Sequence, residues 1–278
     1  MRVAVGDVDE ERAALVAEAL VEVGGRAAVE EADGWVTYVA PPDDPEAWVA
    51  DLEARLLDTV GVPLPVRWSW QAHEDWEVLW RTGLGPRRVG RRLVVAPTWT
   101  DPEPGPDDVV LRIDPGMAFG TAEHATTRVA LTLLEPAVTP GARLLDVGAG
   151  SAILAIAAVR LGAAEALGIE LDPWAASEAE ENARVNGVGD RVRMEARAFL
   201  PDDDVGTFDG VVSNMVSSRL RAALPGLLRA LRAGGWLVLS GVEQHESAAM
   251  AELLAGTGLT LEETATDEGW WGARYRRT

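Results

Sequence analysis

Residues 144–158 read LLDVGAGSAILAIAA, and the fold class can be inferred from them. An apolar run leads into Gly148 and Gly150, and a second apolar run follows at once, which predicts a strand, a tight turn and a helix. Glycines in such a turn let the backbone approach a ligand, because no Cβ stands in the way. Glu170 ends the next predicted strand, where a carboxylate can accept hydrogen bonds from ribose hydroxyl groups. The pattern indicates a nucleotide-binding β–α–β unit.

The alternation of strand and helix runs from residue 108 to the end of the chain. The predicted strands are apolar without alternation, as expected when helices cover both faces of a parallel sheet. This pattern predicts a doubly wound α/β fold. The strands are expected at residues 144–147, 166–170, 191–196, 210–214 and 236–241.

The first 60 residues have a different pattern. Apolar periodicity predicts a helix at 9–23, a strand at 35–40 and a second helix at 46–60. Two prolines then suggest a linker. We therefore expect three parts: a small acidic α+β domain, a linker and the large α/β domain, at residues 1–58, 59–70 and 71–278.

Acidic residues dominate the charge of the chain, which is −20 at pH 7. Residues 1–58 carry four arginines against fifteen acids, a net charge of −11. This excess is either a solvated surface or a docking surface for a basic partner. A nucleic-acid partner is not expected, because duplex-binding proteins carry a basic face. The arginines of residues 81–92 are expected in a solvated loop, with an RNA-facing patch as the alternative.

Several classes of protein are disfavoured by what the chain lacks. It has no run of 18 apolar residues and no cysteine, and its first residues do not resemble a secretory signal. We expect no membrane span, no disulfide and a cytoplasmic protein. His73 and His245 have no partners at metal-ligand spacing, so no metal site is predicted.

Asp146 precedes the first glycine of the turn and bears on the choice of cofactor. A carboxylate there suits a cofactor with an ammonium and a sulfonium, and it would repel a pyrophosphate. The D-x-G-x-G arrangement also resembles motif one of the Rossmann-like methyltransferases. S-adenosylmethionine is therefore favoured over NAD. The alternative role of Asp146 is to cap the turn.

Two further segments carry a more specific resemblance. Residues 114–127 read DPGMAFGTAEHATT, residues 208–215 read FDGVVSNM, and Ser240 and Gly241 end a later strand. With these motifs the chain resembles the ribosomal protein L-eleven methyltransferase family (PrmA). The resemblance implies a Rossmann-like seven-stranded methyltransferase sheet with a small N-terminal α+β domain. It also implies a basic protein of the large ribosomal subunit as substrate.

Site residues are carried over from the family position by position. The resemblance implies that cofactor contacts are made by Thr127, Gly148, Glu170 and Asn214. A loop over the methyl donor would be lined by Phe119, Gly120 and Thr121. With the turn motif, the full set of predicted cofactor-binding residues is Thr127, Gly148, Glu170, Asn214, Asp146, Gly150, Gly120 and Thr121. The predicted catalytic residues are Asn214 and Phe119.

The chain departs from the family pattern at four positions. Ala122 and Ala152 replace glycines, Glu170 replaces an aspartate, and Ser213 replaces an alanine. A left-handed backbone at Ala122 would be strained, whereas an alanine at position 152 is tolerable where a helix packs on a strand. His124 is expected to tie down the backbone rather than transfer a proton.

The implied reaction is methylation of lysine ε-amino groups and of the N-terminal α-amino group. Asn214 either orients the amine or contacts only the cofactor. The alternatives are a methyltransferase for another protein lysine or a small amine, and a binding module without transfer activity. The protein is expected to be a monomer.

Overall fold

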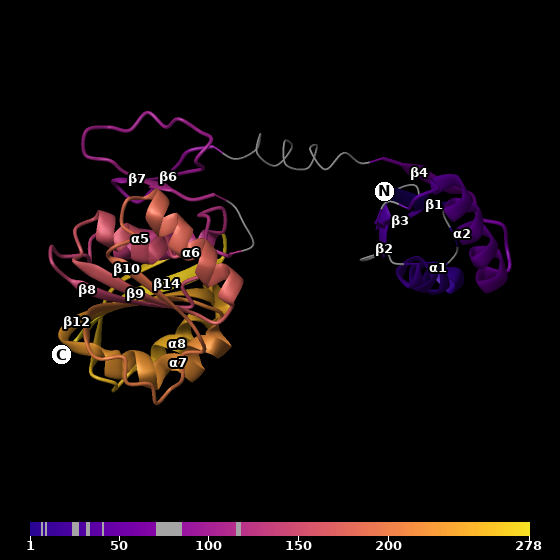
Figure 1. Ribbon diagram of the computed structural model, residues 1–278. Coiled ribbons are helices and arrows are strands. Elements are labelled where there is room, and N and C mark those ends of the chain that lie inside the picture. Colours follow the sequence, from indigo (N-terminus) through magenta and orange to yellow (C-terminus); the bar gives the residue numbers. More distant parts are fainter. Residues whose placement is uncertain are drawn as a thin grey trace. The chain divides into compact units, whose positions relative to one another are not determined.

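The computed structural model describes residues 1–6, 8, 10–23, 28–31, 34–40, 42–70, 85–114 and 118–278. The chain divides into two compact units, Met1–Gly83 and Leu84–Thr278 (Figure 1). The division falls within residues 71–84, which lie outside the described residues. Each unit has its own core and is described by itself.

The first unit is a four-stranded antiparallel sheet with two helices, in the strand order β2-β3-β1-β4. Its predicted helices and strand are confirmed, and β1, β2 and β4 add to them. The elements are β1 (Arg2–Val5), α1 (Glu10–Glu22), β2 (Ala28–Glu31), β3 (Gly34–Tyr38), α2 (Pro45–Val60) and β4 (Val66–Ser69).

Local sequence explains the limits of α2. The Asp44 carboxylate accepts hydrogen bonds from the N–H groups of Glu46 and Ala47, both at 3.1 Å, and thereby caps the helix. Gly61 ends it with a left-handed φ of 78°. Between these ends, apolar side chains at helical spacing are buried in the core of the first unit, among them Leu52 and Leu56.

The predicted linker at residues 59–70 is wrong. Leu64 and Val66 are buried in the core of the first unit, and β4 pairs with β1. The prolines that suggested a linker mark the entry to an edge strand, the place in a sheet where proline is tolerated. The Pro65 carbonyl accepts a hydrogen bond from the Gly6 N–H at 3.4 Å. The described part of the first unit therefore continues through β4, well beyond residue 58.

The second unit is built on a seven-stranded sheet in the order β10-β9-β8-β11-β12-β14-β13. The first five strands of that order are parallel, and β14 runs antiparallel to both of its neighbours. The predicted fold class is confirmed. The elements of this sheet and its helices are α4 (Ala125–Leu134), β8 (Arg143–Val147), α5 (Ile153–Arg160), β9 (Glu165–Glu170), α6 (Pro173–Val185), β10 (Val192–Ala196), β11 (Phe208–Asn214), α7 (Ser217–Ala230), β12 (Leu231–Glu243), the short 3-10 helix η1 (Gln244–Glu246), α8 (Ser247–Leu254), β13 (Leu259–Asp267) and β14 (Trp270–Arg277).

Helices cover both faces of this sheet, with α5 and α6 on one side and α7 and α8 on the other (Figure 1). Neighbouring residues on one strand therefore enter two different cores. On β8, Leu144 packs in the core that contains α4 and α5 side chains, and Leu145 packs in the core under α7. This explains why the parallel strands are apolar at successive positions.

A small sheet precedes the first helix of the second unit, and it consists of β5 (Arg87–Val89), β6 (Leu93–Ala96) and β7 (Val109–Arg112). The loop predicted at residues 81–92 is thus wrong for residues 87–89, which form a strand, but the described arginines of this stretch are exposed to solvent as predicted. Residues 81–84 lie outside the described residues. The Arg88 guanidinium forms two hydrogen bonds with the Asp108 carboxylate, one of them at 2.8 Å. A strand here is stable because β6 provides the backbone partner that the sequence pattern did not reveal.

Candidate active site

The turn after β8 requires glycine by geometry. Gly148 and Gly150 have φ values of 73° and 52°, in the left-handed region that glycine adopts without strain. A Cβ on Gly150 would lie 2.3 Å from the carbonyl oxygen of Phe119. That carbonyl also accepts a hydrogen bond from the Ser151 N–H at 2.9 Å. The backbone of the loop around residue 119 therefore lies directly on the turn, with no room for a side chain at position 150.

Glu170 lies at the end of β9, and both of its carboxylate oxygens are fixed by backbone donors. Oε2 accepts from the Gly150 N–H at 2.9 Å, and Oε1 accepts from the Asp172 N–H at 3.0 Å. Each oxygen has a second lone pair for another donor. The side chain lines the pocket beside Gly148 and Gly150. This is the position in which a carboxylate can bind ribose hydroxyls.

Asp146 lies beneath the turn and is completely buried. Its Oδ2 accepts a hydrogen bond from the Ala155 N–H of α5 at 3.1 Å, and its Oδ1 has no partner among the described residues. The pKa of Asp146 is raised to about 7: burial raises it most, the hydrogen bond from Ala155 lowers it in part, and the charge of Glu170 raises it. Asp146 does not line the pocket, so the structure does not bring its carboxylate to the place predicted for a cofactor ligand. Asp146 instead holds the start of α5 against the turn, which is the alternative role considered above.

His124 caps α4, as predicted. Its Nδ1 accepts from the Thr126 N–H at 3.3 Å and lies 2.9 Å from the Thr126 hydroxyl. Just before it, Ala122 has a φ of 64°, so the left-handed backbone expected there is confirmed. Ala152 has a φ of 60°, which helix–strand packing alone did not predict. A non-glycine residue in this region costs about 1–2 kcal/mol.

Asn214 ends β11 and lines the pocket. Its Nδ2 donates to the hydroxyl oxygens of Thr126 and Thr127, at 3.3 and 3.4 Å. Because both donor contacts go to α4, the side-chain oxygen is left to accept a hydrogen bond from a ligand. Thr127 itself is completely buried behind Asn214, so it supports the site rather than facing the pocket.

One cavity of about 800 Å³ collects most of these groups at the carboxyl ends of the parallel strands. A volume of this size is within the range of small-molecule and cofactor sites. Of the predicted site residues, five line it: Phe119, Gly148, Gly150, Glu170 and Asn214. Four do not: Asp146, Thr127, Gly120 and Thr121. Gly120 is buried behind the loop, where its carbonyl accepts a hydrogen bond from the Ser151 hydroxyl at 2.6 Å.

Sequence reasoning missed an aromatic wall of the pocket. Phe119, His124 and Trp270 form a row in which the Phe119 and His124 rings are 5.3 Å apart and the His124 and Trp270 rings 5.1 Å apart. All three line the cavity. Trp270 begins β14 and is far in sequence from every motif, so no local signal identified it. Other residues that line the pocket were also missed, among them Arg197, Phe199, Met215 and Arg219.

Five parallel strands, an antiparallel hairpin, a glycine turn and a carboxylate at the end of the second strand define a Rossmann-like S-adenosylmethionine-dependent methyltransferase. The family model described as "Ribosomal protein L11 methyltransferase (PrmA)" matches residues 8–278. The chain belongs to this family, as the sequence motifs indicated.

Relatives support the assignment over most of the chain. A ribosomal protein L11 methyltransferase of Pelobacter propionicus is 38% identical over 256 residues, which cover 86% of this chain and 80% of the relative. A second relative, from Geobacter sulfurreducens, is 39% identical over 244 residues, which cover 86% of this chain and 80% of the relative. The crystal structure of a ribosomal protein L11 methylase from Lactobacillus delbrueckii matches with a TM-score of 0.64 and 31% identity, over 69% of this chain and 98% of that one. Among the described residues, no helix has the length and apolar character needed to cross a membrane.

Proposed function

We propose that this enzyme transfers methyl groups from S-adenosylmethionine to lysine ε-amino groups and to the α-amino group of ribosomal protein L11. One observation carries the proposal. A single cavity joins the Gly148–Gly150 turn and Glu170 to Asn214 and the row of aromatic rings. Relatives of this chain bear the name of that activity, and the cavity offers a cofactor end and an acceptor end.

The cofactor end is formed by the turn and Glu170. A Cβ would lie 2.3 Å from the Phe119 carbonyl oxygen at Gly150 and 2.7 Å from the Met215 side chain at Gly148, so both glycines leave a bare backbone that can approach the ligand. Glu170, held by two backbone N–H groups, would accept bonds from the ribose hydroxyls. When bound there, S-adenosylmethionine supplies a methyl group that its sulfonium already activates. The chain must then chiefly align the acceptor amine with that methyl group.

The acceptor amine must be neutral to attack. A free lysine has a pKa near 10.4, so its deprotonation near pH 7.5 costs about 4 kcal/mol. Burial against Phe119 and Trp270 would lower the pKa of that lysine, because desolvation disfavours the charged form. Asn214 would accept a hydrogen bond from the amine through Oδ1 and so direct its lone pair. No dedicated base is needed, and His124 keeps its role as the cap of α4.

The acidic first unit is proposed to dock the substrate. Its net charge of −11 over residues 1–58 is complementary to a basic ribosomal protein. The protein is proposed to act as a monomer in the cytoplasm, without a specific nucleic-acid partner. Glu30, Glu31 and Asp33 contribute to this charge. Asp33 lies outside the described residues, and so do the side chains of Glu30 and Glu31.

The test is methylation of ribosomal protein L11 that lacks the modification, followed by intact-mass spectrometry. Added mass in steps of one methyl group supports the proposal, and an otherwise matched Glu170→Ala enzyme should add far less. Methylation of a different lysate protein, or of small amines only, would favour one of the alternative acceptors. Binding of S-adenosylmethionine without any transfer would indicate a binding module.

A further inference from the structure

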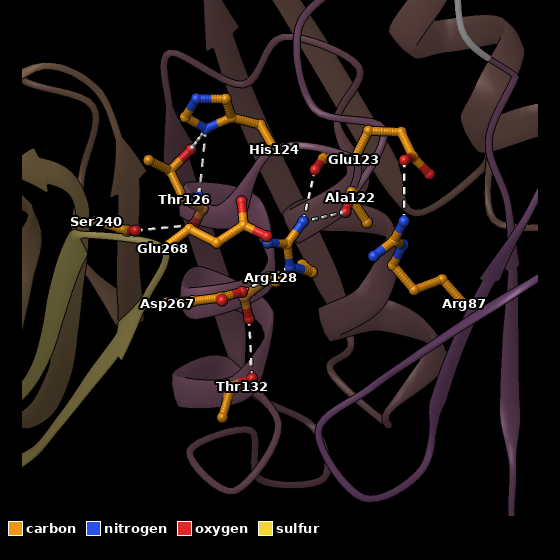
Figure 2. Close-up of polar contacts among 10 residues, drawn as sticks. All are labelled: Arg87, Ala122, Glu123, His124, Thr126, Arg128, Thr132, Ser240, Asp267 and Glu268. Atoms are coloured by element: carbon orange, nitrogen blue, oxygen red, sulfur yellow. Dashed lines mark hydrogen bonds and ion pairs between the residues drawn. The ribbon is translucent and has the colours of Figure 1, made fainter. Parts of the chain in front are cut away.

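Arg128 lies in the first half of α4 with a side chain that is only 12% exposed. Its Nε donates to Asp267 Oδ2 at 2.6 Å, and its Nη2 lies 3.0 Å from Glu268 Oε1. Asp267 is the last residue of β13, and Glu268 begins the turn that leads to β14. Figure 2 shows the guanidinium between this turn and the start of α4.

The same guanidinium also binds the loop that precedes α4. Its Nη1 donates to the carbonyl oxygen of Glu123 at 2.5 Å and to that of Ala122 at 3.4 Å. A second arginine, Arg87, binds the Glu123 carboxylate at 3.0 Å (Figure 2). Arg128 thus joins two segments that are about 140 residues apart in sequence, one before α4 and one near the end of the chain.

Both segments have a backbone that needs external support. Ala122 and Glu268 are non-glycine residues with positive φ, 64° and 47°. Each costs about 1–2 kcal/mol relative to an ordinary conformation. Such conformations persist when the surrounding structure holds them. Arg128 contacts both residues directly.

Each segment also carries part of the aromatic wall. The loop carries Phe119 and His124, and Trp270 follows Glu268 by two residues. The rings of the two segments meet where His124 contacts Trp270 at 5.1 Å. Whatever holds the loop and the turn together therefore sets the width of the acceptor end of the pocket.

We propose that Arg128 is a positioning residue for methyl transfer: it fastens the loop and the β13–β14 turn so that Phe119 and Trp270 stand on either side of His124. The proposal rests on the proposed function, in which this wall receives the amine. An arginine suits the task because its planar group offers five donors in several directions. Without it, the carboxylates of Asp267 and Glu268 would repel each other and two carbonyls would lose a donor.

The test compares Arg128→Gln with a matched control, Arg274→Gln. Arg274 is 14% exposed, binds the two carboxylates of Glu262 and Glu263 at 3.0 Å each, and donates to the Leu133 carbonyl of α4 at 3.2 Å. Arg274 lies on β14 of the same hairpin and contacts the same helix, and neither arginine lines the pocket. The two variants therefore remove similar bonds. Only Arg128→Gln removes the link between the loop before α4 and the β13–β14 turn, which we call the clamp.

We expect Arg128→Gln to lower kcat/KM for ribosomal protein L11 by about 10- to 100-fold, the effect of misplacing reacting groups by about 1 Å. The dissociation constant for S-adenosylmethionine should change far less, because Glu170 and the glycine turn are intact. Arg274→Gln should lose stability but keep kcat/KM within about twofold. Arg128→Lys should recover only part of the activity, since a lysine cannot bind both segments as a fork.

A second measurement separates this proposal from the proposed function. Hydrogen exchange of the backbone amides of residues 118–124 and 267–270, without any substrate, should be faster in Arg128→Gln than in Arg274→Gln. Glu268→Gln, at a side chain that is 72% exposed, should shift exchange and kcat/KM in the same direction by a smaller amount and without risk to folding. Equal exchange and equal kcat/KM in the Arg128 and Arg274 variants would overturn the clamp. A parent enzyme that leaves ribosomal protein L11 unmodified would overturn the function, whereas the exchange data would still decide on the clamp.

Discussion

The Glu170 Oε2 atom accepts a hydrogen bond from the Gly150 N–H at 2.9 Å, so the acid at the end of β9 is tied to the turn after β8. One carboxylate thus fixes the shape of the glycine turn and offers its remaining lone pairs to the pocket. The two halves of the cofactor site cannot be altered independently.

Replacing Glu170 by alanine should weaken the binding of S-adenosylmethionine by about 1.5–3 kcal/mol, the range for hydrogen bonds to a charged group. Titration calorimetry measures the change directly. The control is Glu165→Ala at the exposed start of the same strand, where Glu165 binds only Arg143 in the described structure. Unchanged affinity in the Glu170 variant would remove this residue from the site.

Gly150→Ala should abolish tight cofactor binding. The added methyl carbon would lie 2.3 Å from the Phe119 carbonyl oxygen, so the loop or the turn must move. Gly141→Ala is the control, because Gly141 also has a positive φ, 78°, but nothing lies within 4 Å of its Cβ position. Both variants should lose about 1–2 kcal/mol of stability from backbone strain. Only Gly150→Ala should weaken cofactor binding by more than tenfold, which corresponds to about 1.4 kcal/mol.

Asp146 should make the free energy of unfolding depend on pH. Its pKa is 3.8 in the unfolded reference and about 7 when buried in the fold. Between these values the folded protein holds a proton that the unfolded chain has lost, so the contribution of Asp146 to stability is greatest at low pH and falls as the pH rises toward 7. The slope is about 1.4 kcal/mol per pH unit.

Urea unfolding of the parent and of Asp146→Asn, measured between pH 4 and 8, tests this expectation. The stability of the parent relative to the variant should decrease up to about pH 7 and then stay level. Asp190→Asn, at a side chain that is 82% exposed, should show a nearly constant difference. A flat difference for Asp146→Asn as well would mean that the carboxyl is not protonated in the folded state near neutral pH.

A chain that begins at Leu84 should keep its affinity for S-adenosylmethionine and lose methylation of ribosomal protein L11. Every described residue that lines the pocket lies in the second unit. The cut falls at the unit boundary because removal of residues 1–58 alone would leave β4 without β1. A thermal melt establishes that the shortened chain is folded. Normal methylation by that folded chain would show that the first unit does not dock the substrate.

Salt should lower kcat/KM for the protein substrate more than it lowers cofactor affinity. Fifteen acids against four arginines in residues 1–58 would attract a basic partner at long range, and salt screens such attraction over about 10 Å at 0.1 M. Joint replacement of Glu30, Glu31 and Asp33 by their amides should flatten the dependence and leave kcat at saturating substrate almost unchanged. A kcat/KM that is independent of salt in the parent would identify the acidic residues as a solvated surface.

Local sequence was sufficient to predict the fold class and three residues that line the pocket at the end we propose for the cofactor. Gly148, Gly150 and Glu170 could be identified because each sits at a strand end within one β–α–β unit, where chain geometry brings the ends together. The expectation that His124 ties down the backbone also depends on a local contact, since its partner Thr126 is two residues away. Family resemblance added Asn214 and Phe119, which the structure also brings to the pocket.

The acceptor end was decided by the tertiary structure. Trp270 reaches His124 only because β14 lies antiparallel between β12 and β13, an arrangement that no short motif encodes. Arg128 and Asp267 are 139 residues apart, and their ion pair depends on α4 packing against that hairpin. In sequence, Asp146 cannot be distinguished from an acid that binds a ligand. Only its complete burial indicates that it holds the start of α5 instead. Sequence patterns determine what neighbouring residues can do, whereas burial and long-range contacts arise only when distant elements pack together.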